Sequence, residues 1–187
     1  MTINMKVEDK QKLSNKIKQT TGLGLLLIVL GLVALVQSLF TEVESSLLFE
    51  EMFLAGGAIR LLYALNTRHS KKFVLKLIVS LVYILTGLLV VLTQSLQNTI
   101  NVVILGTAII FSGIIETILA VQVRRFAFQW GWILLSGIIA IILGIAIVSG
   151  NNASDKIGIL VGINILASGL WITLVSRATI KQLQKTA

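Results

Sequence analysis

The chain has 187 residues, of which 56% are hydrophobic and only 13% charged, and its formal net charge is +8. This composition excludes a soluble domain, because a chain of this length cannot surround helices that are apolar on every side with enough polar surface. The lack of cysteine excludes disulfides, thiolate metal sites and cysteine catalysis, and a single histidine excludes a histidine metal cluster. We therefore expect an integral membrane protein.

Six apolar stretches follow one another along the chain. Each is about twenty residues long, which is the length that an α-helix needs to cross a hydrocarbon core about 30 Å thick. The sequence thus predicts an all-α membrane protein with six transmembrane helices and short loops. We place the spans at 22–40, 47–66, 73–93, 99–123, 130–149 and 157–176.

The positive charges lie on one side of these spans. Fourteen of the 16 lysine and arginine residues precede the first span, follow the sixth, or lie near the connections after the second and fourth spans. On the opposite side the only basic residue is Lys156, which follows Asp155. The positive-inside rule then predicts that both termini are cytoplasmic. Because topology accounts for the charge, we expect no nucleic-acid partner.

The segment 1–21 precedes the first span and is rich in lysine. Its residues 8–19 could form a short helix on the inner leaflet, with Leu13 and Ile17 on one side and the lysines in contact with anionic lipid headgroups. The alternative is a solvated and partly disordered arm, since the segment contains few apolar residues.

The six spans form an internal repeat with a period of about 56 residues. Three helical-hairpin repeats are expected at 22–77, 78–134 and 135–187, the last with a short cytoplasmic tail. Each repeat contains two spans, so the three are parallel and related by a pseudo-threefold axis. Residue pairs seven positions apart, which are glycines except at Glu50 and Ser80, recur at matching positions. The glycines predict helix-packing seams within and between hairpins, although the alternative of a permeation path remains open. These glycines are Gly24, Gly31, Gly57, Gly87, Gly106, Gly113, Gly137, Gly144, Gly162 and Gly169.

The repeat resembles that of a known family. WGWILLSGIIAIILGIAIVSG (residues 130–150) is similar to the opening helix of the short repeat in HdeD-type acid-resistance membrane proteins, and FLAGGAIRLLYAL, IIFSGIIETILAV and ILASGLWITLVS resemble its second half. The resemblance covers nearly the whole chain, but this chain lacks the proline that usually follows each odd helix. It implies a bacterial inner-membrane protein linked to acid or envelope stress.

Two ionisable residues lie inside predicted spans. Arg60 and Glu116 are 56 residues apart, occupy equivalent positions in the first two repeats and sit about 10–12 Å from the cytoplasmic helix ends. The third repeat has Ile172 there. A charge at the bilayer centre costs about 2.5–3.5 kcal/mol, which predicts a mutual pair inside the bundle. Alternatively, Arg60 extends to the headgroups while Glu116 is protonated or hydrogen-bonded to a hydroxyl such as that of Thr117.

Glu50 and Glu51 are candidate acid-sensing residues, because the second span is too short unless it includes them and partial desolvation raises a carboxyl pKa. The alternative is a pair of solvated interfacial carboxylates. Asn164 is expected to form a structural hydrogen bond across the bundle.

The expected function is non-catalytic. The sequence contains no phosphate loop, nucleophile elbow or metal-binding doublet, so we expect neither an enzyme nor a cofactor. The expected partner is the lipid bilayer, and a homo-oligomer or a membrane-protein partner is left open. A stress-associated protein that stabilises the membrane or a complex is one hypothesis. The other is a small channel or carrier for protons or small solutes with Arg60 and Glu116 as its polar centre.

Overall fold

Six α-helices make up the computed structural model, which describes residues 7–40, 46–68, 70, 72–93, 98–124, 130–149 and 157–185. The predicted all-helical fold is confirmed. The helices are α1 (Val7–Phe40), α2 (Ser46–Asn66), α3 (Phe73–Leu92), α4 (Asn98–Val123), α5 (Trp130–Ser149) and α6 (Ile157–Lys185).

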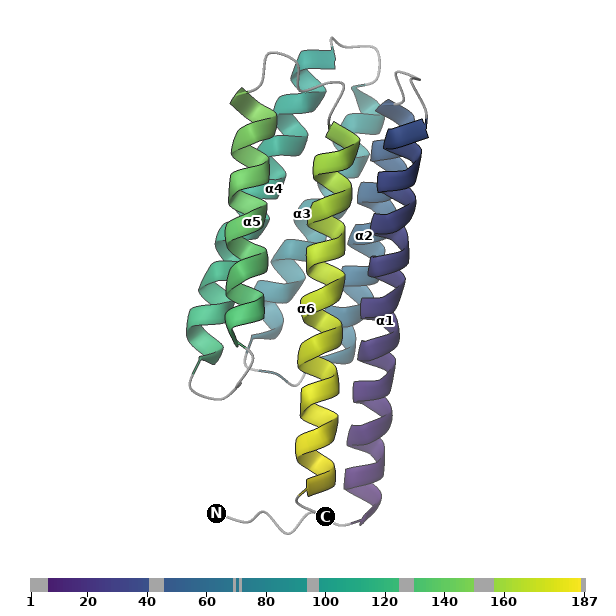
Figure 1. Ribbon diagram of the computed structural model, residues 1–187, viewed down its shortest axis with the longest axis vertical. Helices are drawn as coiled ribbons and strands as arrows, with labels where there is room; N and C mark the ends of the chain where they lie inside the picture. Colours follow the sequence, from purple (N-terminus) through teal and green to yellow (C-terminus); the bar gives the residue numbers. More distant parts are fainter. Residues whose placement is uncertain are drawn as a thin grey trace.

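The helices form one bundle in which consecutive helices run in opposite directions, as Figure 1 shows. Three helix pairs pack most closely: α1 with α6, α2 with α3, and α4 with α5. The helices that follow one another within a predicted hairpin, such as α1 and α2, are in looser contact. The first helix therefore packs most tightly against the last one.

Five of the six helices are long and apolar enough to cross a membrane: α1, α3, α4, α5 and α6, each over most of its length. Helix α2 is not among them, because Glu50, Glu51 and Arg60 interrupt its apolar sequence. With several such helices, the chain is a multi-pass membrane protein.

Helix α1 begins earlier than expected. The sequence allows a separate surface helix at residues 8–19 or a disordered arm, but residues 7–21 continue the first span as one uninterrupted helix, and residues 1–6 lie outside the described residues. Its inner side meets the end of α2, where Asn66 Nδ2 donates hydrogen bonds to the Lys16 carbonyl and to Thr20 Oγ1, both at 2.9 Å. At the same end of the bundle α6 continues through the expected tail, so that α1 and α6 extend beyond the other helices (Figure 1).

The outer surface is apolar and the interior carries polar groups. Leu26, Val29 and Val36 on α1 are each more than half exposed, whereas Arg60, Glu116 and Asn164 are buried. This is the reverse of a soluble protein, and a lipid environment explains it. Helices α4 and α6 bury larger shares of their spans than α1, α3 and α5, so these two helices lie deeper in the interior.

All ten predicted packing glycines lie against a neighbouring helix. Gly24, Gly31, Gly162 and Gly169 join α1 to α6, Gly106, Gly113, Gly137 and Gly144 join α4 to α5, and Gly57 and Gly87 join α2 to α3. These seams lie between the predicted hairpins and not within them. Because lipid provides no hydrophobic drive between helices, close backbone approach at glycine is what stabilises such pairs.

The three glycine seams share one register. A Cβ on Gly144 would meet Ile110, four residues after Gly106, and a Cβ on Gly31 would meet Leu166, four residues after Gly162. In the third seam a Cβ on Gly87 would meet Leu54, four residues after Glu50, the residue at the corresponding position. The same local geometry thus occurs three times around the bundle.

We predict that Gly144→Leu lowers the thermal stability of the detergent-solubilised protein. A Cβ at Gly144 would lie 2.6 Å from Ile110 Cγ1 and 2.8 Å from the Gly106 carbonyl oxygen, so α4 and α5 must separate. The matched control on the same helix is Gly131→Leu, because a Cβ there meets nothing within 4 Å. Equal melting temperatures for the two variants would contradict the proposed role of the seam.

Candidate functional site

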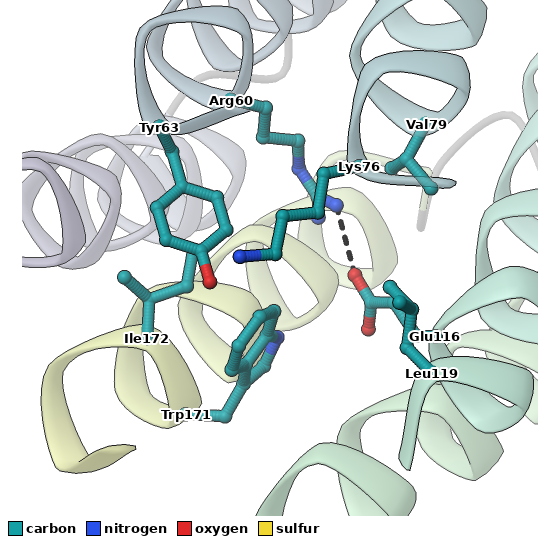
Figure 2. A pocket seen from close by; sticks show the side chains of 8 residues that line it. All are labelled: Arg60, Tyr63, Lys76, Val79, Glu116, Leu119, Trp171 and Ile172. Carbon is teal, nitrogen blue, oxygen red and sulfur yellow. Dashed lines mark hydrogen bonds and ion pairs between the residues drawn. The ribbon is translucent and has the colours of Figure 1, made fainter. Parts of the chain in front are cut away.

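The structure brings Arg60 of α2 and Glu116 of α4 into direct contact. Arg60 Nη1 donates a hydrogen bond to Glu116 Oε1 at 2.8 Å, and the two side chains are only 6% and 3% exposed. Figure 2 shows this contact as a dashed line. The pair is therefore a buried salt bridge inside the bundle, and Arg60 does not extend to the headgroups.

Three hydroxyl groups complete the coordination of this ion pair. Ser136 of α5 donates to Glu116 Oε2 at 3.0 Å. Arg60 Nη2 donates to Ser168 Oγ of α6 and to Tyr83 Oη of α3, the latter at 3.3 Å. A buried ion pair is stabilised only when its remaining lone pairs and protons are also satisfied, and these hydroxyls satisfy most of them.

Tyr83 connects the ion pair to the rest of the core. Its hydroxyl donates to Asn164 Oδ1 at 2.9 Å, its ring lies 4.2 Å beneath the Arg60 guanidinium, and Phe53 stacks on that ring at 5.0 Å between centroids. We call Arg60, Tyr83, Glu116, Ser136, Asn164 and Ser168 the polar network. It includes residues of α2, α3, α4, α5 and α6 and holds these five helices in one arrangement.

A small cavity of about 20 Å³ adjoins the network, and it has room for about one water molecule. Its walls include Arg60, Glu116 and Ile172, the three residues at equivalent repeat positions, so these positions converge at the centre of the bundle. Tyr63, Lys76 and Trp171 contribute further polar groups to the lining. Figure 2 shows the Lys76 side chain extending toward Tyr63, and its Nζ lies 4.4 Å from the centre of that ring.

The structure does not bring the other acidic candidates to this site. Glu51 has an exposed side chain near the start of α2, about two and a half turns before Arg60. The side chain of Glu50 lies outside the described residues. Asn164 joins the polar network, and Thr117 does not bond to Glu116.

Sequence reasoning missed four residues of the site. Ser136 and Ser168 directly precede packing glycines, so the sequence pattern shows them as small residues and does not show that they are donors to a buried charge. Tyr83 lies within the apolar third span. Lys76 was assigned only to the basic residues that indicate the membrane orientation. A tyrosine in the middle of a span was the available signal, because a buried hydroxyl requires a partner.

The site consists of an ion pair and hydrogen-bonding side chains. Within the described ranges, histidine, aspartate and glutamate side chains form no cluster that could hold a metal ion. Glu116 has its oxygens occupied by Arg60 and Ser136, so it is held as an ion-pair partner.

The chain is a multi-pass helical membrane protein with a buried ion pair at its centre. It belongs to the family described as a short repeat of unknown function (DUF308), whose model matches residues 22–92 and 99–149. The match in two segments, which cover α2 to α5 and the membrane part of α1, supports an internal repeat. No curated protein and no solved structure matches the chain.

We predict that Arg60→Leu and Glu116→Leu each destabilise the protein, whereas the double variant recovers much of the loss. Removing one partner leaves a charge in low dielectric that costs about 2.5–3.5 kcal/mol, and removing both leaves none. The measurement is a double-mutant cycle on thermal stability in detergent. Additive losses would show that the two charges are not coupled.

Proposed function

We propose that the protein is a six-span, non-catalytic component of the bacterial inner membrane that acts in acid or envelope stress by stabilising the membrane or a partner complex. The observation that carries the proposal is the polar network, which uses the polar groups of five helices to hold the bundle closed. The stress association comes from the resemblance to HdeD-type proteins, which belong to the same short-repeat family.

The proposal includes α2 as a sixth span. Its 21 residues give a length of about 31 Å, which is sufficient to cross the hydrocarbon core. It lies within the bundle beside α1 and α3, and its central charge is neutralised by Glu116. The shared register of the three glycine seams supports three parallel hairpin repeats related by a pseudo-threefold axis.

The expected orientation has both termini in the cytoplasm. Helix α1 begins and α6 ends at the same end of the bundle (Figure 1), and Lys16, Lys18, Arg68, Arg124 and Arg177 lie toward that end. The exposed lysines of α1 are positioned to contact anionic lipid headgroups there.

A reporter fused after Ala187 tests this orientation. We expect a reporter that works only in the cytoplasm to be active and one that works only in the periplasm to be silent, because basic segments are retained on the inner side. A fusion within 151–156, between α5 and α6, is the matched control and should give the opposite pattern. An externally active C-terminal fusion would contradict the proposed topology.

The stress role is tested by the survival of a deletion strain after exposure to graded acid pH. We expect the deletion to reduce survival and the wild-type gene to restore it. The double variant Arg60→Leu with Glu116→Leu should also restore survival, since the proposed role needs a folded bundle and not an ionisable centre. Unchanged survival of the deletion strain at every pH would contradict the acid-resistance role.

The charged cavity beside the network favours one alternative, a small channel or carrier for protons or small solutes. Proton flux into proteoliposomes at graded external pH distinguishes the two functions. Flux that is lost in Glu116→Gln and retained in Glu51→Gln, the exposed control, would favour transport. If the wild type, Glu116→Gln and Glu51→Gln all show no proton flux, the result favours the structural role.

A further inference from the structure

The cavity beside the polar network has features that the structural role leaves unused. It lies between α2, α3, α4 and α6, toward the end of the bundle that carries the basic residues. We propose that it binds one small monovalent anion of halide size. This inference goes beyond the stress role and does not depend on it.

Two buried N–H donors on residues that line the cavity have no acceptor among the described residues. They are Arg60 Nε and Trp171 Nε1, and their side chains belong to residues that are only 5% and 6% exposed. An unpaired buried donor costs about 1–3 kcal/mol, so a bound acceptor at this place would be stabilising.

A third donor is the Lys76 ammonium. Its Nζ donates to Thr67 Oγ1 at 3.0 Å and lies over the Tyr63 ring, which leaves further protons available because an ammonium carries three. Lys76 and Arg60 contribute two positive charges to the cavity wall, and Glu116 contributes one negative charge whose oxygens already accept from Arg60 and Ser136. The net charge of the lining is positive, which favours an anion over a cation.

The size of the cavity selects among anions. The cavity of about 20 Å³ has room for one small particle, so a halide ion, which is larger than water, is near its upper limit of size and a large organic anion does not fit. Farther from the basic end, Phe53, Tyr83 and Ile109 pack with at most 1% exposure. The anion would therefore enter from the basic end and stop at the network.

The test compares thermal stability of the purified protein in sodium chloride, sodium bromide and sodium gluconate at equal ionic strength. We expect chloride and bromide, but not gluconate, to raise the melting temperature with a saturable dependence on concentration. Lys76→Met and Trp171→Phe each remove one donor to the anion, and we expect either to raise the half-saturating concentration about tenfold.

The matched controls are Lys72→Met and Trp132→Phe. Lys72 lies one turn before Lys76 and bonds to Gln122, and neither Lys72 nor Trp132 lines the cavity. Both controls should keep the wild-type half-saturating concentration. The proposal would be overturned if gluconate raised the melting temperature as much as chloride does. It would also be overturned if the cavity variants and the control variants had equal half-saturating concentrations.

A bromide-soaked crystal of the wild-type protein gives a second readout that needs no variant. An anomalous peak within hydrogen-bond distance of Trp171 Nε1 or Arg60 Nε supports the site. If bromide peaks occur only on the surface, the bound bromide is an adventitious ion only. That result would overturn the proposed site even if the melting temperature depends on salt.

Discussion

The fold depends on the need to neutralise two charges inside a bilayer. Bulk water does not reach Arg60 or Glu116, whose side chains are 6% and 3% exposed, so each charge needs a partner inside the bundle. Their contact connects α2 to α4 across the centre of the bundle, and the surrounding hydroxyls add links to α3, α5 and α6. The helix with the least apolar sequence is thereby held inside by electrostatics and not by its hydropathy.

Glycine seams provide the second constraint: two of them join consecutive helices, and the third joins α1 to α6, which are far apart in the sequence. In lipid, close contact of backbones replaces the hydrophobic effect as the source of specificity. The seams pair each odd helix with an even one, and contacts of Arg60 with Glu116 and Ser168 connect the even helices α2, α4 and α6 across the centre. The glycine seams thus hold neighbouring helices together around the bundle, and the polar network connects helices at its centre.

Much of this arrangement follows from residue pattern. The helical fold could be predicted because long apolar segments must form helices in a membrane. The packing glycines could be predicted from their heptad spacing, and the proximity of Arg60 to Glu116 because a buried charge needs a partner. The pairing of helices could not, since identical glycine spacing is compatible with seams inside or between hairpins. Tyr83, Ser136 and Ser168 escaped notice because a small or aromatic residue in a span shows its hydrogen-bonding role only when its neighbour in space is known. The local sequence allows a helix at residues 8–19, but its direct continuation into the first span and its contact with the end of α2 are visible only in the structure.

The tight pairing of α1 with α6 has a consequence for biosynthesis. A ribosome delivers α1 first and α6 last, so the glycine face of α1 around Gly24 and Gly31 has no partner until the rest of the chain has been inserted. The packing of α6 against α1 is then the last step of assembly. It is slow because the two helices are far apart in the sequence. During that interval the exposed glycine face of α1 is open to pairing with α6 of another nascent chain, an exchange that would give a domain-swapped dimer with the same seams.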